Sequence, residues 1–245
     1  MKPRCFFVAL LLLMTGSQTL DAQKVAVLLK NDQTIRYDVS QVEAIMFEEE
    51  EDMHEYVDLG LPSGTLWATC NIGANSPEEK GYYISWGETQ PKEEYTWDTY
   101  KYCRGSLETM TKYNVASQYG LIDNLTELLP EDDAATMNWG PSWQMPSREQ
   151  VEELINSEYT TMGSLRLNDK WCLQITSNIN GNSIYLPVAG RIGSDGLYTG
   201  GCYYWTRTLY LREPYRGWYL YFSGGAYSNQ AYRSSGYTIR PVRRL

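Results

Sequence analysis

The segment Asp132–Leu154, DDAATMNWGPSWQMPSREQVEEL, contains the local signals around which the rest of the chain is organised. Pro130 suits the first turn of a helix, and the acidic residues that follow it suit the positive end of the helix dipole. We therefore expect a first helix from Pro130 to Asn138. Gly140 and Pro141 end it, because neither residue favours continuation of a helix.

A second helix is indicated shortly afterwards. Ser147 is a favourable N-cap residue, and Gln150 three positions later completes the pattern of a capping box. Val151 and Leu154 recur at helical spacing and define one apolar face. These signals predict a helix over residues 148–157. The two helices are the helical part of a chain that otherwise has the pattern of β structure.

The composition indicates a β-rich, exported protein. The 245 residues and 42% hydrophobic content suit one sizeable domain with an appendage. Tyrosine (21 residues) and tryptophan (8) greatly outnumber phenylalanine (4), and aromatic rings with a polar edge suit half-exposed sheets and binding surfaces. The formal charge of −9 argues against a nucleic-acid partner, which is bound through clustered Lys and Arg.

The N-terminus has the pattern of a secretory signal peptide. Lys2 and Arg4 precede the apolar run Phe6–Met14, which is too short to span a bilayer, and small or polar residues continue to Ala22. We expect residues 1–22 to be removed. The mature protein would then be in the periplasm, at the cell surface or secreted, with no transmembrane segment.

Two short regions precede the main domain. Residues 23–47 predict a small β module, and chains could pair with one another through residues 24–47. Residues 48–55 form an acidic linker in which we expect the single histidine, His54, to be a solvated loop residue. The main domain is expected over residues 56–245.

Within the main domain the predicted order is strands, a long aromatic loop over 89–119, the two helices, and further strands. This order defines an α+β domain. In the strand 217–223, Trp218, Leu220 and Phe222 alternate with Tyr219 and Tyr221, so we expect it to be half-buried with one polar aromatic face. The strands are expected at residues 56–59, 65–68, 81–88, 170–176, 183–187, 203–208, 217–223 and 237–242.

Six ordered motifs carry a family resemblance. They are Tyr56–Ala68 (YVDLGLPSGTLWA), Ser85–Glu88 (SWGE), Pro130–Ala135 (PEDDAA), Trp143–Ser147 (WQMPS), Leu186–Gly190 (LPVAG) and Ile239–Val242 (IRPV). Together they resemble the Fibrobacter succinogenes major paralogous domain family, in the version abundant in gut Bacteroidetes. The resemblance implies a C-type-lectin-like or formylglycine-generating-enzyme-like fold. In such a fold two helices flank a small twisted antiparallel sheet with long loops.

Sequence motifs for catalysis or metal binding are absent. A calcium-dependent lectin site needs triplets rich in side-chain oxygen, and the nearest strings, Glu213-Pro214-Tyr215 and Asn168-Asp169-Lys170, each lack an essential ligand. No phosphate loop, dinucleotide fingerprint or nucleophile elbow occurs. We therefore expect no catalytic residue, no metal and no cofactor.

Four cysteines follow the signal peptide: Cys70, Cys103, Cys172 and Cys202. In an exported chain they could form two disulfides with three possible connectivities, or they could simply be buried. The pairing we name is Cys70 with Cys103. A formylglycine-generating activity would need a reactive cysteine pair, and no cysteine is singled out for it.

The aromatic residues Trp86, Tyr95, Trp97 and Tyr100 are the candidate ligand-binding residues. Such rings can stack on the apolar faces of sugars, or they can form a satellite core that holds the long loop. The sequence favours an exported, non-enzymatic binding module for a glycan or surface protein. The alternatives are an assembly subunit that pairs through its N-terminal strands and a formylglycine-generating-type enzyme.

Overall fold

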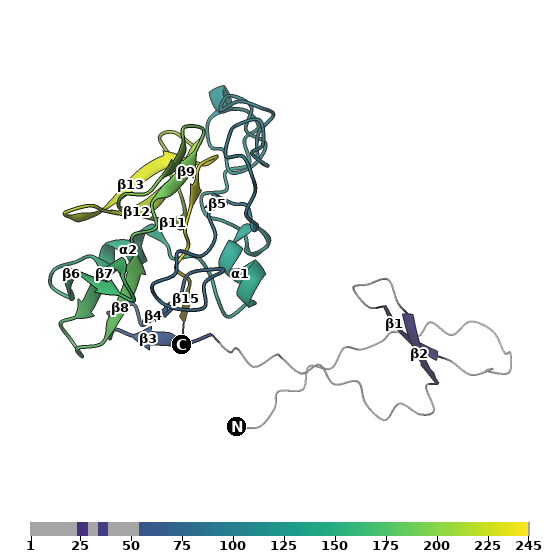
Figure 1. Ribbon diagram of the computed structural model, residues 1–245. Coiled ribbons are helices and arrows are strands. Elements are labelled where there is room, and N and C mark those ends of the chain that lie inside the picture. Colours follow the sequence, from purple (N-terminus) through teal and green to yellow (C-terminus); the bar gives the residue numbers. More distant parts are fainter. Residues whose placement is uncertain (1–23, 29–33, 39–53, 245) are drawn as a thin grey trace, which may run out of the picture. The chain divides into compact units, whose positions relative to one another are not determined.

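The computed structural model describes residues 24–28, 34–38 and 54–244 (Figure 1). The chain divides into two units, Met1–Glu51 and Asp52–Leu245. In the first unit, β1 (Lys24–Leu28) pairs antiparallel with β2 (Thr34–Asp38). The predicted signal peptide and most of the predicted linker lie outside the described residues.

One small sheet joins the two ends of the second unit. Its strands are β3 (Tyr56–Asp58), β4 (Thr65–Ala68) and β15 (Val242–Arg244). The central strand is β4, and both outer strands pair with it antiparallel. His54 belongs to this unit and stacks on Trp139 with ring centroids 3.8 Å apart. The expectation that His54 is a solvated linker residue is therefore wrong, because its ring is packed against an indole.

The first predicted helix is split in two. A 3-10 turn, η3 (Pro130–Asp132), is followed by α1 (Ala134–Trp139). Asp133, between them, has an extended backbone and caps α1, because its carboxylate accepts hydrogen bonds from the backbone of Ala135 and Thr136. The helix over residues 130–138 is thus interrupted by its own N-cap.

The second predicted helix is present as α2 (Arg148–Leu154). The capping box is confirmed: the Ser147 hydroxyl accepts from the Gln150 backbone, and the Gln150 side chain accepts from the Ser147 backbone. The helix ends three residues earlier than expected, and Ile155 is its C-cap.

An antiparallel three-stranded sheet follows α2. It contains β6 (Thr160–Leu167), β7 (Lys170–Ser177) and β8 (Ser183–Pro187), in that order. The sequence predicted β7 and β8. It did not predict β6, which is an outer strand of the sheet and is largely polar and exposed.

The sheet of β11 (Cys202–Leu209), β12 (Arg216–Phe222) and β13 (Ala226–Tyr232) separates two apolar clusters. Tyr219 belongs to the cluster that contains Trp86, and Leu220 belongs to the cluster that contains Val151 and Leu154. Both faces of β12 thus contact apolar side chains. Tyr219 is buried and Tyr221 is half-buried, so the strand is half-buried as expected but its tyrosine face is less exposed than a polar face would be.

A four-stranded sheet has the order β10, β9, β14, β5. The strands are β5 (Ile84–Ser85), β9 (Arg191–Gly193), β10 (Gly196–Tyr198) and β14 (Gly236–Tyr237). The strands predicted over 81–88 and 237–242 are therefore shorter than expected. The second unit consists mostly of small antiparallel sheets with few helices, which is compatible with the α+β class.

The long loop is held by its rings and by one buried carboxylate. It contains a single turn of 3-10 helix, η2 (Ser117–Tyr119). The carboxylate of Asp132 accepts hydrogen bonds from the hydroxyls of Tyr102 and Tyr113, and it forms a 2.5 Å ion pair with Lys112. Because Asp132 is buried in η3, these contacts fix the loop against the helical segment.

Two glycines beside the β9–β10 hairpin allow a matched stability test. Gly190 has φ +72°, and a Cβ placed there would lie 1.9 Å from the Tyr198 carbonyl oxygen. Gly196 has φ +90° with open space around it. We expect Gly190→Ala to lower the free energy of unfolding by about 2 kcal/mol, and Gly196→Ala by about 1 kcal/mol, because only Gly190 adds a collision to the conformational cost. Urea denaturation measures both. Equal losses would contradict the close approach at Gly190.

Candidate functional site

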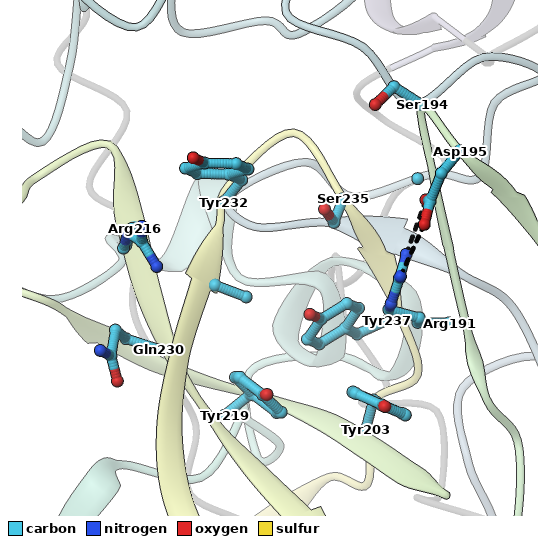
Figure 2. A pocket seen from close by; sticks show the side chains of 12 residues that line it. Arg191, Ser194, Asp195, Tyr203, Arg216, Tyr219, Gln230, Tyr232, Ser235 and Tyr237 are labelled. Atoms are coloured by element: carbon cyan, nitrogen blue, oxygen red, sulfur yellow. Dashed lines mark hydrogen bonds and ion pairs between the residues drawn. The ribbon is translucent and has the colours of Figure 1, made fainter. Parts of the chain in front are cut away.

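A pocket of about 460 Å³ lies between the β9–β10 turn and the sheet of β11, β12 and β13 (Figure 2). Side chains from five strands and two turns line it, so residues separated by up to 46 positions converge on one place. The floor is aromatic, and the rim is polar and charged. Its volume falls in the range of small-molecule sites.

Three tyrosines form the floor: Tyr203 from β11, Tyr219 from β12 and Tyr237 from β14. The rings of Tyr203 and Tyr219 stack with centroids 5.7 Å apart. The Tyr237 ring meets each of them edge to face, at 5.3 and 4.9 Å. Burial raises the pKa of Tyr219 to about 12 and also raises the pKa of Tyr203 and Tyr237. All three are therefore neutral phenols at neutral pH.

The Tyr237 hydroxyl is the most informative atom of the floor. The residue is only 4% exposed, and within the described part of the chain its hydroxyl makes no hydrogen bond. The ring of Tyr237 is buried, whereas the hydroxyl at its tip is open to the pocket, as is common for the polar end of a tyrosine. Figure 2 shows this hydroxyl directed into the pocket, so it is available to a molecule bound there.

The rim contains two arginines, each beside a carboxylate. Arg191 donates from Nη1 and Nη2 to the two oxygens of Asp195, at 2.8 and 2.7 Å. This fork lowers the pKa of Asp195 to about 2 and raises the pKa of Arg191, so both stay charged at neutral pH. On the opposite side, Arg216 Nε lies 3.0 Å from Glu213 Oε2.

Tyr232 is the exposed ring of the rim. It is 45% exposed, and it lines the pocket at the end of β13. The Trp97 ring packs against it with centroids 5.8 Å apart, and the Arg216 guanidinium lies 4.8 Å from its centre. The Tyr232 ring is thus held in position by Trp97 and Arg216, and part of its surface is open to solvent.

Two of the four aromatic residues singled out by the sequence are part of the core. Trp86 is fully buried, and its Nε1 donates to the carbonyl of Thr206 at 2.8 Å. Tyr100 is buried as well. Its hydroxyl donates to the Trp86 carbonyl at 2.7 Å and accepts from Arg233 Nε at 2.7 Å. The polar atoms of both rings are used internally, so the structure supports the satellite-core interpretation for them.

The other two lie near the pocket without forming it. Tyr95 is buried, its hydroxyl donates to the Tyr83 carbonyl, and its ring borders a smaller pocket of about 380 Å³ on the other side of the β9–β10 turn. Trp97 supports Tyr232. Sequence reasoning missed Tyr232 and Tyr237 as site residues. The alternation around Tyr219 was visible in the sequence, but it did not indicate which other segments this strand meets.

The four described cysteines, Cys70, Cys103, Cys172 and Cys202, are free thiols. The bond predicted between Cys70 and Cys103 is not formed in the structure; the Cys103 sulfur instead contacts the Trp97 carbonyl at 3.1 Å. Burial raises the pKa of Cys172, and it raises that of Cys202 to about 12. These thiols are therefore protonated at neutral pH, which makes them poor nucleophiles.

Comparison of the chain with protein-family models, with curated proteins and with solved structures gives no significant match. The family resemblance therefore rests on the six sequence motifs. Among residues 54–244 and the two N-terminal strands, no three His, Cys, Asp or Glu residues are grouped so that they could hold a metal ion. No helix in the same residues is long and apolar enough to cross a membrane.

Proposed function

We propose that this protein is an exported, non-enzymatic binding module that recognises a glycan through the tyrosine pocket. The observation that carries the proposal is the Tyr237 hydroxyl, which makes no hydrogen bond within the described chain and is open to a pocket with the exposed Tyr232 ring on its rim. Pockets that combine an aromatic surface with a few convergent polar groups are typical ligand sites.

The chemistry of the pocket suits a sugar ring. The apolar face of a pyranose can lie against Tyr232, because aromatic rings offer large contact area at low entropic cost. Sugar hydroxyls can then pair with the Tyr237 hydroxyl and with the free lone pairs of Asp195. A protein ligand could use the same rings, but a small group of polar side chains around the Tyr237 hydroxyl fits a small polyhydroxylated unit better.

Two further parts of the proposal come from the sequence. Export is supported by the signal-peptide pattern of residues 1–22, and surface or periplasmic recognition follows from it. A lectin-like scaffold is supported by the six motifs and by two short helices accompanying small antiparallel sheets.

A glycan array followed by calorimetry tests the function. We expect the wild-type protein to bind a glycan, Tyr232→Ala to weaken that binding about tenfold, and Tyr237→Phe to weaken it several-fold, from the lost ring contact and the lost hydrogen bond respectively. Tyr82→Ala is the control, because Tyr82 is 43% exposed and lies outside the pocket.

Two outcomes would contradict the proposal. One is glycan binding that neither pocket variant weakens. The other is no glycan binding at all together with oligomers that disappear when residues 24–47 are deleted, which would favour an assembly subunit that pairs through its N-terminal strands.

A further inference from the structure

The two arginines that line the tyrosine pocket differ in how much of each guanidinium is occupied. Arg191 uses both Nη1 and Nη2 to hold Asp195, at 2.8 and 2.7 Å. Arg216 contacts Glu213 through Nε, at 3.0 Å, and its Nη1 and Nη2 form no hydrogen bond with any residue that the structure describes. The Nε atom is buried, whereas the side chain as a whole is 27% exposed. Arg216 therefore keeps unused donors at the pocket.

The neighbours of Arg216 hold its guanidinium in position. Glu213 Oε2 lies beside Nε, and the other oxygen of Glu213 accepts a hydrogen bond from the Tyr215 hydroxyl. The guanidinium carbon of Arg216 lies 4.8 Å from the centre of the Tyr232 ring. Contacts of this kind fix the orientation of the group before a ligand binds, which reduces the entropic cost of binding.

Arg216, Gln230 and Tyr232 lie on one face of the β12–β13 pair. Arg216 is directly opposite Tyr232 in the ladder, and Gln230 is two residues before Tyr232 on β13, so the three side chains share a face. Figure 2 shows the side chains of Arg216 and Gln230 on the same side of β13. The side-chain amide of Gln230 forms no hydrogen bond within the described residues. A guanidinium, an amide and an exposed ring are thus brought together.

We propose that the tyrosine pocket binds an acidic sugar, such as a uronic acid, and that Arg216 holds its carboxylate. The inference rests on the proposed glycan-binding function and adds the class of glycan. The sugar ring lies against Tyr232, and the carboxylate accepts from Nη1 and Nη2 of Arg216. Two parallel N–H groups of an arginine match the two oxygens of a carboxylate in spacing and in charge. The amide of Gln230 supplies a further donor.

The charges of the lining favour a ligand with a single negative charge. The lining contains two arginines and one carboxylate, that of Asp195, which is a formal excess of one positive charge. Glu213, which is outside the lining, offsets part of this excess. A ligand with several negative charges would meet both carboxylates, whereas one carboxylate can be balanced by Arg216. The formal charge of −9 on the whole chain acts mainly at long range and is screened over about 8 Å at physiological salt.

The experiment compares matched probes on the full chain. Oligosaccharides of glucose and galactose are each paired with the corresponding uronic-acid oligosaccharide, and dissociation constants are measured by calorimetry. We expect the wild-type protein to bind the uronic-acid member at least about fivefold more tightly. Arg216→Gln should abolish this preference, because the carboxylate then has no cation with free donors.

Two further variants separate the fork of Arg216 from its charge. Arg216→Lys keeps the charge but loses the paired N–H groups, so it should retain only part of the preference. Arg212→Gln is the control, because it removes the same charge at an exposed position outside the pocket lining and should leave the preference unchanged.

Each outcome distinguishes the two proposals. Equal or tighter binding of the neutral oligosaccharides by the wild-type protein would overturn this inference and leave glycan binding intact. A preference for uronic acids that Arg216→Gln and Arg212→Gln alter equally, or that neither alters, would overturn the role of Arg216. Binding of neither series, with no other glycan bound on the array, would overturn the proposed function and this inference with it.

Discussion

Replacing Arg233 by methionine is expected to lower the free energy of unfolding by at least about 3 kcal/mol, the largest effect that we expect from a single substitution in this chain. Arg233 is completely buried. Its Nη1 donates to the carbonyls of Tyr113 and Pro214, at 3.0 and 2.9 Å, and its Nη2 donates to the carbonyl of Lys112 at 3.0 Å. Methionine fills a similar volume but leaves two buried carbonyls and one partly buried carbonyl without these donors.

The reason for the size of this effect is that Arg233 joins parts of the chain that lie far apart in the sequence. Residues 112 and 113 belong to the long loop, and residue 214 precedes β12. Within the described residues no carboxylate pairs with Arg233. Its charge is instead surrounded by carbonyl oxygens and by the ring of Trp86, whose centre is 4.8 Å away.

Urea denaturation followed by tryptophan fluorescence measures the effect. Arg212→Met is the matched control, because Arg212 is exposed and its replacement should change stability by less than about 0.5 kcal/mol. Arg233→Lys should fall between the two, since lysine keeps the charge but cannot reach three carbonyls with a planar fork. If Arg233→Met and Arg212→Met lose the same free energy, the bridging role of Arg233 is wrong.

Asp133→Ala is expected to destabilise the domain by about 2–4 kcal/mol. The Asp133 side chain is buried and accepts from three backbone N–H groups: those of Ala135 and Thr136 at the start of α1, at 2.9 and 3.1 Å, and that of Met145 at 2.9 Å. Alanine would leave all three donors without a partner. The start of α1 and the segment that leads to α2 would separate.

A neighbouring acid provides the control. Glu131 lies two residues earlier and is exposed, so Glu131→Ala should have little effect in the same thermal and urea measurements. Asp133→Asn should be milder than Asp133→Ala, because the amide oxygen can still accept part of the hydrogen bonds. Equal melting temperatures for Asp133→Ala and Glu131→Ala would contradict the role assigned to this carboxylate.

The features that the sequence predicted are those that depend on neighbours in the chain. The capping box of Ser147 and Gln150 could be predicted because all of its atoms lie within one turn. The interruption at Asp133 could not, because it depends in part on the Met145 backbone, twelve residues away. Strand β13 was missed because its sequence, AYSNQAY, has little apolar alternation and forms only when β12 pairs with it.

The candidate site could also be predicted only in part, because it depends on contacts between distant parts of the sequence. Trp86 is indistinguishable in sequence from an exposed sugar-stacking residue, and only its bond to Thr206, 120 positions away, identifies it as core. Tyr232 and Tyr237 are ordinary residues of a tyrosine-rich chain until the β9–β10 turn lies across from them. An aromatic-rich sequence therefore predicts that aromatic side chains will contact one another. Which of these side chains stay accessible to a ligand depends on contacts between segments that are far apart in the sequence.

The strand pairing β3–β4–β15 has a consequence for how the protein is made. The strand β4 forms its ladder with residues 56–58, made early, and with residues 242–244, made almost two hundred residues later. During synthesis this sheet cannot be completed until the last of these residues has left the ribosome. Contacts of such long sequence separation are slow to form. Until then β4 has only β3 as a partner, so the sheet that holds both ends of the second unit is the last to be completed.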